Sequence, residues 1–364
     1  MLTEQFRKCR LTRHADDFAG CHMGPRPARE DPLGPLATRI LRSAATRGDV
    51  TAVLGGMSQP KLLIVGAGAV GGYFGGRLVQ AGRDVTFLVR DRRAQQLRQR
   101  GLEIVSPHGD AKIDAKITTT AELKEPFDLV LLAVKQYALD AAIADVAPAI
   151  GESSAILPVL NAMRHLDRLR AAFGGTHVLG GVCIVATTLD ANERIVQLSE
   201  MQELSYGELD GTLSERIRAI DRTMQGAGFI ARLSSSIQLE MWEKWVFIAA
   251  LGGVTCLLRG TIGEVQHAPR GRDLTIAMLD ECVAVATAAG YAPRPPARDR
   301  AFNVLTDANS NLASSLYRDL QKGQPLEADA IIGDICARGE AAGVKVPLLS
   351  AAYAQLSMYE QKRA

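Results

Sequence analysis

The sequence predicts an α/β fold built on a parallel β-sheet, in a chain that forms two domains. The 364 residues, 47% of them hydrophobic, can bury a substantial core and exceed the usual size of one domain. The apolar run from Leu62 to Val65 is typical of a strand buried on both faces, and a glycine-rich turn and an apolar helix follow it directly. Repeated strand–turn–helix units of this kind build parallel sheets.

Residues 1–57 differ from the rest of the chain. They are rich in Arg, Gly and Pro without a sustained period, a composition that rarely supports a packed core. They also lack the long apolar core of a secretory signal, and their acidic residues argue against a transit peptide. We therefore predict a disordered N-terminal extension or a misplaced start, with Met57 as a plausible true start. The cysteines and histidines of this segment match no metal-ligand spacing, so we predict no metal site. They are Cys9, His14, Cys21 and His22.

The charge pattern favours a small-molecule substrate as the partner. The formal net charge is +2 and the basic residues are dispersed, whereas nucleic-acid binding needs a one-sided basic patch. Six cysteines are widely spaced without a CxxC pair, which predicts reduced thiols in a cytoplasmic protein. The uncharged run from Trp245 to Leu258 is too short to span a bilayer. We therefore predict no nucleic-acid partner and no membrane partner.

Three glycines follow the first strand in the pattern GxGxxG. In this context Gly66 permits the sharp turn, Gly68 lets a pyrophosphate approach N–H groups at the helix N-terminus, and Gly71 allows close packing of the helix on the strand. A second strand, DVTFLV, arrives after the helix. The pattern predicts a dinucleotide site, and a glycine-rich turn in another kind of α/β unit is the alternative. The predicted cofactor-binding residues of the turn are Gly66, Ala67, Gly68, Ala69, Val70 and Gly71.

The end of the second strand decides which dinucleotide fits. NAD sites usually carry Asp or Glu about 20 residues beyond the glycines, where the carboxylate binds the ribose hydroxyls. This chain has Arg90, whose guanidinium suits the 2′-phosphate of NADP, and Arg92 and Arg93 add positive charge. We therefore predict NADP(H). The alternative is a solvated basic turn, which the neighbouring Asp91 favours.

Two further strands end in polar residues that are candidates for the same site. The strand from Leu129 to Val134 ends at Lys135, and the segment AILPVLN ends at Asn161. In an open parallel sheet, ligands bind beyond the C-terminal ends of the strands. We therefore predict that Lys135 and Asn161 contact cofactor and substrate. Each residue alone also suits an ordinary polar strand end.

The segment MWEKWVFIAALGG, residues 241–253, sets one lysine in a run of large apolar side chains. On a helix, Lys244 shares a face with Ile248 and Gly252, because side chains three or four positions apart stack on the same side. One interpretation is that the stem of Lys244 covers an apolar stripe while its ammonium reaches solvent and pairs with Glu240. The other is that the ammonium has a chemical role.

The order of these motifs resembles the ketopantoate reductase (2-dehydropantoate 2-reductase) family, from about residue 60 to near the C-terminus. The resemblance implies an N-terminal Rossmann dinucleotide-binding domain followed by an all-helical C-terminal domain, with NADPH and a 2-oxo acid in the cleft between them. It also implies an NADP-dependent oxidoreductase, with the reduction of ketopantoate in pantothenate biosynthesis as the leading candidate. The resemblance rests on GAGAVGG with Arg90, AVKQY around Lys135, LN at Asn161, WEKWVF around Lys244, NLASSLYRDLQKG with Ser315 and Asp319, and LEADAIIGDI with Glu327.

The resemblance also implies residue roles. The lysine matching Lys244 is the general acid, the glutamate matching Glu327 holds the substrate hydroxyl, and the serine matching Ser315 helps to bind the substrate carboxylate. Lys135 and Asn161 match residues that organise cofactor and substrate. Hydride delivery to a ketone leaves negative charge on oxygen, which an ammonium stabilises and protonates. Taken alone, Glu327 also suits a first-turn carboxylate on a helix, and Ser315 suits a small polar helix position.

The sequence departs from the family at the predicted substrate pocket. Ile248 and Gly252 stand where the family usually has asparagines, and Ala162 and Arg164 replace the usual glycines after Asn161. A missing hydrogen bond strongly changes substrate discrimination, so we keep two alternatives. One is a paralogue that reduces a different carbonyl compound, and the other is a non-catalytic NADPH-binding redox sensor.

The domain boundary is predicted within the polar segment LSSSIQ. Residues 58–234 would form the NADP-binding Rossmann domain, and residues 235–364 would form the helical substrate domain. A two-domain cleft of this kind can close on its substrate by hinge motion. A homodimer through the helical domain is a further hypothesis.

Overall fold

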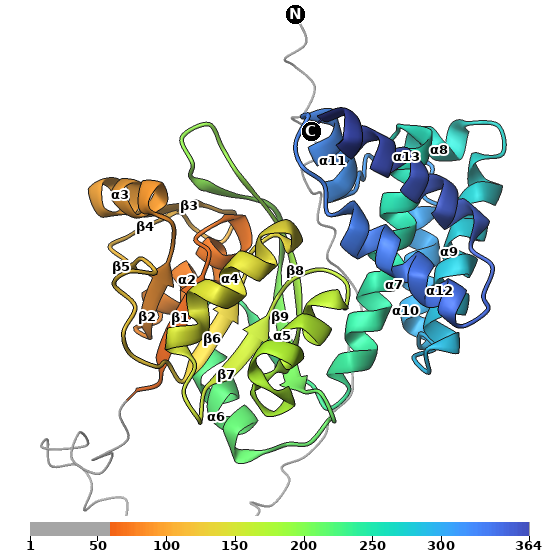
Figure 1. Ribbon diagram of the computed structural model, residues 1–364. Helices are drawn as coiled ribbons and strands as arrows, with labels where there is room; N and C mark the ends of the chain where they lie inside the picture. Colours follow the sequence, from red (N-terminus) through yellow and green to blue (C-terminus); the bar gives the residue numbers. More distant parts are fainter. Residues whose placement is uncertain (1–58, 364) are drawn as a thin grey trace, which may run out of the picture. The chain divides into compact units, whose positions relative to one another are not determined.

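A five-stranded parallel sheet forms the centre of the N-terminal half of the computed structural model, which describes residues 59–363 (Figure 1). Its strand order is β5-β2-β1-β6-β7, and all neighbouring strands are parallel. In β1, Leu62 and Ile64 face one apolar core while Leu63 and Val65 face another, because side chains alternate along a strand. The strands are β1 (Lys61–Val65), β2 (Asp84–Leu88), β5 (Lys116–Thr118), β6 (Leu129–Leu132) and β7 (Ala155–Pro158).

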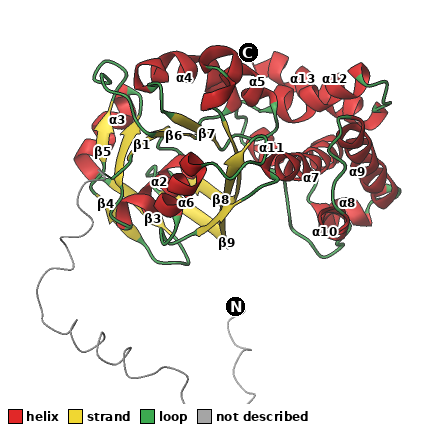
Figure 2. Ribbon diagram, turned by 90° about the horizontal axis from the view of Figure 1, so that it is seen from below, coloured by secondary structure: helices red, strands yellow, loops and turns green. Residues whose placement is uncertain are grey.

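Helices cover both faces of this sheet. Figure 2 shows α4 and α5 on one face and α2 on the opposite face. Apolar residues of α2 pack with Ile64, whereas those of α4 and α5 pack with Leu63, which explains why the strands are apolar without interruption. The α-helices of this half are α2 (Ala69–Gln80), α3 (Asp91–Arg100), α4 (Leu139–Val146), α5 (Arg164–Phe173) and α6 (Glu215–Met224), and its 3₁₀ helices are η1 (Gln136–Ala138), η2 (Ala147–Ala149) and η3 (Gly175–His177).

A second sheet is built from two separate parts of the chain. Its strand order is β10-β9-β3-β4, and β8 pairs with β9 as a long antiparallel hairpin. A single bridge between Ile156 and Val178 brings the start of β8 alongside β7. The start of β9 pairs with β3, so the hairpin turn, residues 190–194, lies beside that strand. The strands are β3 (Leu102–Val105), β4 (Ala111–Ile113), β8 (Leu179–Leu189), β9 (Ile195–Glu208) and β10 (Ile230–Leu233).

The C-terminal half is helical and packs around one long apolar helix, α7. Trp242 and Trp245 of α7 are fully buried, and the indole of Trp242 stacks on Tyr291. Of the helices that the structure describes, α7 alone has the length and hydropathy of a membrane span, but 67% of its most apolar stretch is buried inside the fold. The elements are α7 (Ile237–Leu258), α8 (Ile262–His267), α9 (Gly271–Ala288), α10 (Pro295–Leu305), α11 (Ser315–Gln321), the π-helix η4 (Asp329–Gly333), α12 (Asp334–Ala341) and α13 (Pro347–Arg363).

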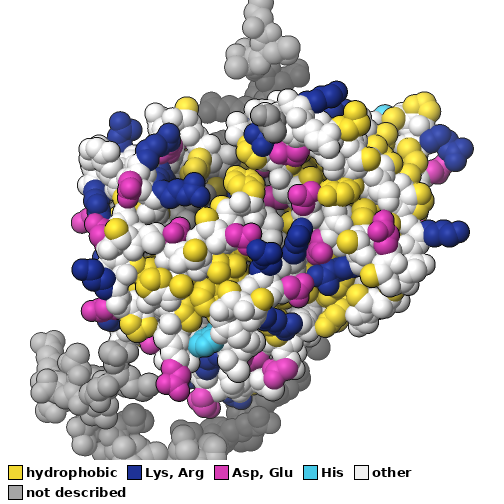
Figure 3. All heavy atoms as spheres, viewed as in Figure 1, with side chains coloured by type: hydrophobic (Ala, Val, Ile, Leu, Met, Phe, Trp, Pro, Cys, Tyr) yellow, Lys and Arg dark blue, Asp and Glu magenta, His cyan; other side chains and the backbone are white. Residues whose placement is uncertain are grey.

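The predicted fold class is confirmed: a Rossmann-type α/β half precedes an all-helical half. Strand β10 ends at Leu233 and α7 begins at Ile237, but the boundary between residues 234 and 235 stays a prediction, because the described residues pack as one compact unit. The segment 1–57 and its four cysteines and histidines lie outside the described residues. On the face drawn in Figure 3, basic and acidic side chains of the described residues are interspersed, without one basic patch.

Candidate active site

The glycine turn after β1 has the backbone that a dinucleotide needs. Gly66 has a φ of 94°, which glycine adopts without strain. A side chain at Gly71 would place its Cβ 2.1 Å from the Gly66 carbonyl oxygen, so the close contact of helix α2 with the turn requires glycine there. A Cβ at Gly68 would meet nothing within 4 Å, which leaves open space in front of the N-terminus of α2. These residues fit the pyrophosphate of a dinucleotide.

The turn lies where the strand order of the sheet reverses. Strand β1 pairs with β2 on one side and with β6 on the other, and β6 leads outward to β7. A Cβ at Gly66 would lie 3.2 Å from the carbonyl oxygen of Ala133, two residues before Lys135. Ligands of open parallel sheets bind at such a switch point. The fold therefore brings Lys135 beside the predicted cofactor turn.

The basic residues after β2 are not equivalent. Arg90 is exposed at the N-cap of α3. Arg93 is mostly buried and donates to the carbonyl oxygen of Ala67 in the glycine turn (3.2 Å) and to the carboxylate of Glu193 (3.1 Å). Arg92 also pairs with Glu193. Glu193 lies in the β8–β9 turn, 100 positions after Arg93, and sequence reasoning missed it because no local pattern indicates the contact.

Lys135 and Glu327 meet across the two halves of the fold. The Lys135 ammonium lies 3.3 Å from the Glu327 carboxylate and 3.2 Å from that of Asp319. The backbone N–H of Gln136 donates to the second Glu327 oxygen at 3.0 Å. Burial disfavours the charged form of Lys135, but the charges of Glu327 and Asp319 outweigh it and raise the pKa of this ammonium. Lys135, which the strand pattern selected, therefore forms one cluster with Asp319 and Glu327, which the family resemblance selected.

Glu327 is buried, with 7% of its surface exposed, and lies just before the π-helix η4. π-helices are rare in proteins, and those that occur often lie at functional sites. Trp245 of α7 donates from its indole nitrogen to the carbonyl oxygen of Ile331 in η4 (2.9 Å). This bond ties the turn of α7 that carries Lys244 to the segment that carries Glu327.

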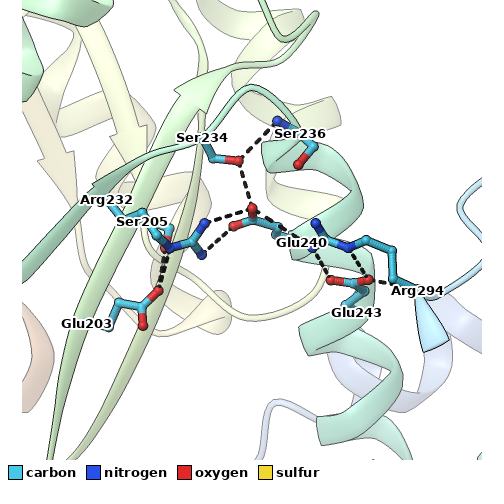
Figure 4. Close-up of polar contacts among 8 residues, drawn as sticks. All are labelled: Glu203, Ser205, Arg232, Ser234, Ser236, Glu240, Glu243 and Arg294. Carbon is cyan, nitrogen blue, oxygen red and sulfur yellow. Dashed lines mark hydrogen bonds and ion pairs between the residues drawn. The ribbon is translucent and has the colours of Figure 1, made fainter. Parts of the chain in front are cut away.

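Lys244 is half-buried on the face of α7 that looks toward β8. Its Nζ lies 3.9 Å from the sulfur of Cys183, and that thiol also approaches the carbonyl oxygen of Val159 (3.5 Å), two residues before Asn161. The ion pair with Glu240 that the sequence allows does not form in the described structure, because Glu240 binds Arg232 and Ser234 instead (Figure 4). Lys244 is thus close to the end of β7 without a carboxylate partner among the described residues.

His165, which sequence reasoning missed, lies in the first turn of α5, four residues after Asn161. It is fully buried, and neither ring nitrogen has a hydrogen-bond partner within the described residues. Burial, with the charge of Lys244 adding to it, lowers the pKa of His165 to about 3. The imidazole is therefore neutral at physiological pH. The sequence signal was a histidine four residues after a strand-end asparagine, which is weak because buried histidines are common.

The remaining predicted site residues lie on α7 and α11. Ser315 is the first residue of α11 and is partly exposed, whereas Ser314 is the buried N-cap and accepts from the backbone N–H of Tyr317. Ile248 is partly buried one turn after Lys244. Gly252 is buried, and a Cβ there would lie 3.0 Å from Leu316 of α11. Its lack of a side chain thus lets α11 pack closely against α7.

Comparison with known proteins identifies the family. The family model described as "Ketopantoate reductase PanE/ApbA" matches residues 62–211, and the model described as "Ketopantoate reductase PanE/ApbA C terminal" matches residues 236–360. The chain belongs to the ketopantoate reductase family. It is 36% identical over 303 residues to the "Uncharacterized oxidoreductase YkpB" of Bacillus subtilis (strain 168), a match that covers 83% of this chain and 100% of the relative.

Solved structures agree with this membership. The crystal structure of 2-dehydropantoate 2-reductase from Geobacter metallireducens GS-15 matches with a TM-score of 0.75 at 26% identity, over 82% of this chain and 99% of that chain. The ternary structure of D-mandelate dehydrogenase with NADH and anilino(oxo)acetate has the same fold, with a TM-score of 0.75 at 20% identity over 83% and 99% of the two chains. The protein is thus an oxidoreductase of this family that uses a nicotinamide dinucleotide.

Proposed function

We propose that this protein reduces a 2-oxo acid to the 2-hydroxy acid with NADPH. The first candidate substrate is 2-dehydropantoate, which would place the protein in pantothenate biosynthesis. The observation that carries the proposal is the half-buried ammonium of Lys244, which has no carboxylate partner among the described residues and lies close to the end of β7. A half-buried charge without a partner costs stability, so its presence in a ligand-binding region favours a chemical role.

Lys244 acts as the general acid in this proposal. When bound, the nicotinamide supplies the hydride that reduces the carbonyl carbon. The Lys244 ammonium stabilises the negative charge that develops on the carbonyl oxygen, and Nζ then gives a proton to that oxygen. The product is the 2-hydroxy acid, and the lysine regains its proton from solvent. The apolar surroundings of α7 strengthen the electrostatic contact by limiting water.

Other residues orient the substrate. Glu327 accepts a hydrogen bond from the hydroxyl group that forms, and Lys135 balances the charge of this carboxylate. The hydroxyl of Ser315 donates a hydrogen bond to the substrate carboxylate, while Asn161 contacts cofactor and substrate at the end of β7. Ile248 and Gly252 line the apolar wall of the pocket. Positioning of this kind converts a bimolecular encounter into an effectively unimolecular step.

The cofactor preference for NADP rests on Arg90. Its exposed guanidinium at the end of β2 has no ion-pair partner among the described residues, so it is available for the 2′-phosphate. Glu193 opposes this preference. It pairs with Arg92 and Arg93, and its negative charge next to these arginines disfavours the 2′-phosphate. We infer that Arg90 makes the main contact with the 2′-phosphate and that Glu193 limits the contribution of the other two arginines.

A second candidate is a paralogue that reduces a 2-oxo acid with a larger apolar group. Ile248 favours it, because an apolar side chain one turn after Lys244 cannot hydrogen-bond a hydroxylated substrate. The D-mandelate dehydrogenase of the same fold was solved with an aromatic 2-oxo acid derivative. Both candidates use the same reaction and differ in the side chain of the substrate.

The protein is proposed to act in the cytoplasm. All four cysteines among the described residues are free and buried: Cys183, Cys256, Cys282 and Cys336. Free thiols persist in reducing compartments.

The test is the oxidation of NADPH and NADH by the purified protein with 2-dehydropantoate and with a panel of aliphatic and aromatic 2-oxo acids. Fastest turnover with 2-dehydropantoate and NADPH supports the first candidate. Fastest turnover with an aromatic 2-oxo acid supports the paralogue. Binding of NADPH without turnover of any 2-oxo acid would overturn the proposal and would support the redox sensor.

A further inference from the structure

The first turns of α7 carry two carboxylates beside the proposed proton donor. Glu240 precedes Lys244 by four positions, and a glutamate N-terminal to a lysine at this spacing is the favourable order for an ion pair on a helix. Glu243 directly precedes Lys244 and points to another face of the helix. Glu240 is 8% exposed, so its charge needs a partner inside the fold.

That partner is Arg232 on β10. Its two terminal nitrogens donate to both oxygens of the Glu240 carboxylate at 2.9 and 2.6 Å, and the hydroxyl of Ser234 donates to the same carboxylate at 2.8 Å (Figure 4). Nε of Arg232 donates to Glu203 of β9 at 2.9 Å, which fixes the guanidinium on the sheet. The bidentate geometry gives the pair both strength and a defined orientation.

A second arginine holds the other carboxylate. Arg294, just before α10, donates to Glu243 from its backbone N–H (2.9 Å) and from two guanidinium nitrogens (2.8 and 2.5 Å). Figure 4 shows Arg232 and Arg294 approaching the helix from different sides, with Arg232 on Glu240 and Arg294 on Glu243, while Arg294 also lies 4.0 Å from Glu240. Both carboxylates next to Lys244 in the sequence are therefore occupied by arginine.

Few charged groups face Lys244 itself. On β8 its neighbour is the thiol of Cys183 at 3.9 Å, and on α5 it is His165, whose pKa burial lowers to about 3, so that it carries no charge at neutral pH. On α7 the group within reach is Glu240. The ion pairs of Glu240, a close one with Arg232 and a longer one with Arg294, thus decide whether Lys244 has a carboxylate partner.

We propose that Arg232 is a positioning residue for the reaction: by holding the carboxylate of Glu240, it keeps the Lys244 ammonium free to contact the substrate oxygen. The inference rests on the proposed role of Lys244. Without Arg232, only the longer contact with Arg294 at 4.0 Å holds the buried Glu240 carboxylate, so the carboxylate is free to turn to Lys244, one helical turn away. A paired ammonium is drawn away from the substrate and is a weaker acid, because the carboxylate stabilises its charged form.

The test compares the pH profiles of kcat/KM for Arg232→Gln, Arg232→Lys, Glu240→Gln and the double variant Arg232→Gln/Glu240→Gln. A general acid must be protonated, so activity is lost as pH rises past its titration. The alkaline limb is the part of the profile where kcat/KM falls as pH rises. In Arg232→Gln we expect this limb to move to higher pH by about one unit and the plateau value of kcat/KM to fall about tenfold. Arg232→Lys keeps a cation beside Glu240, and the double variant removes the competing carboxylate, so both should restore the position of the limb.

Arg294→Gln is the graded comparison, because it frees Glu243, which does not share a face with Lys244, and removes only the 4.0 Å contact with Glu240, so its limb should move less than that of Arg232→Gln. An unmoved limb in folded Arg232→Gln, or a double variant that stays displaced, would overturn the inference. If Arg232→Gln does not fold, Arg232→Lys and the double variant decide: a displaced limb in the double variant contradicts the inference. Lys244→Ala separates the two proposals, because a fully active Lys244→Ala means that the proposed function has failed, whatever Arg232 does.

Discussion

The ammonium of Lys135 lies 3.3 Å from the carboxylate of Glu327, although 192 positions separate the two residues in the chain. Lys135 follows strand β6 and Glu327 precedes the π-helix η4, so this ion pair joins the α/β half to the helical half. It also joins two residues whose roles we proposed separately. The bond from Gln136 to the same carboxylate fixes Glu327 from a second side.

Glu327→Gln tests the proposed role of this carboxylate. The amide oxygen still accepts from Gln136, so the fold is kept, but the charge that pairs with Lys135 and holds the substrate hydroxyl is lost. We expect kcat/KM to fall about ten- to a hundredfold, since hydrogen bonds to charged groups contribute about 1.5–3 kcal/mol. Steady-state kinetics with the preferred 2-oxo acid measure the effect. Asp329→Asn removes an exposed carboxylate two residues away, which binds Tyr353, and should leave kcat/KM unchanged.

Arg90→Gln tests the predicted preference for NADP. Loss of a guanidinium contact with the 2′-phosphate should raise KM for NADPH about ten- to a hundredfold, whereas KM for NADH, which lacks that phosphate, should stay nearly constant. The ratio of the two values is the decisive quantity. A parallel change for both cofactors would mean that Arg90 acts on the turn and not on the phosphate.

Glu193→Gln should act in the opposite direction. Removing this carboxylate releases Arg92 and Arg93, which it now pairs, and the freed guanidinium groups can contact a 2′-phosphate. Because partly exposed ion pairs contribute up to about 1 kcal/mol, we expect KM for NADPH to fall about three- to fivefold. NADH kinetics serve as the control. An increased KM for NADPH would indicate that Glu193 instead holds the arginines in the geometry that the phosphate needs.

His165 makes a prediction about stability and pH. Its pKa is lowered to about 3 in the folded protein, from an ordinary value near 6.5, so below that value the unfolded chain binds a proton that the folded protein does not. Stability is therefore lost as pH falls. Between pH 7 and pH 5 the loss from this residue should be about 2 kcal/mol. Urea unfolding of His165→Gln should show a smaller decrease over this range, whereas His108→Gln, which removes an exposed histidine, should behave like the unchanged protein.

Ala162 has a left-handed backbone, with a φ of 64°, at a position where the family usually has glycine. The left-handed backbone conformation destabilises a non-glycine residue by about 1–2 kcal/mol. Ala162→Gly should therefore raise the free energy of unfolding by about 1 kcal/mol, after allowance for the greater freedom of glycine in the unfolded chain. Ala142→Gly, within helix α4, should lower it by about 1 kcal/mol. A loss of stability in Ala162→Gly would show that this backbone is not strained.

The sequence was sufficient to predict the parts of the fold that depend on residues close together in the chain. The uninterrupted apolar strand β1 and the spacing of Gly66, Gly68 and Gly71 depend on neighbouring residues, so the sequence could predict the dinucleotide turn. Lys135 and Asn161 could be selected because strand ends of a parallel sheet meet at one edge. The helical half and the role of Glu327 came from the family resemblance.

Contacts between distant segments could not be predicted in the same way. Glu193 reaches Arg93 only because a long hairpin carries its turn to α3, and the pairing register sets that distance. Helix spacing favoured a pair between Glu240 and Lys244, but tertiary structure supplies Arg232, which makes two charged hydrogen bonds in place of one. A local preference of a few tenths of a kcal/mol is easily outweighed by such a partner.

The central claim is that Lys244 donates the proton to the carbonyl oxygen. The most direct measurement is the single-turnover rate of NADPH oxidation by Lys244→Ala with the preferred 2-oxo acid, after fluorescence titration has established that the variant still binds the dinucleotide. Loss of a general acid predicts a rate about 10²- to 10⁴-fold below that of the unchanged protein, with partial recovery when a small primary amine is added. A rate close to that of the unchanged protein, with the dinucleotide bound normally, would contradict the account.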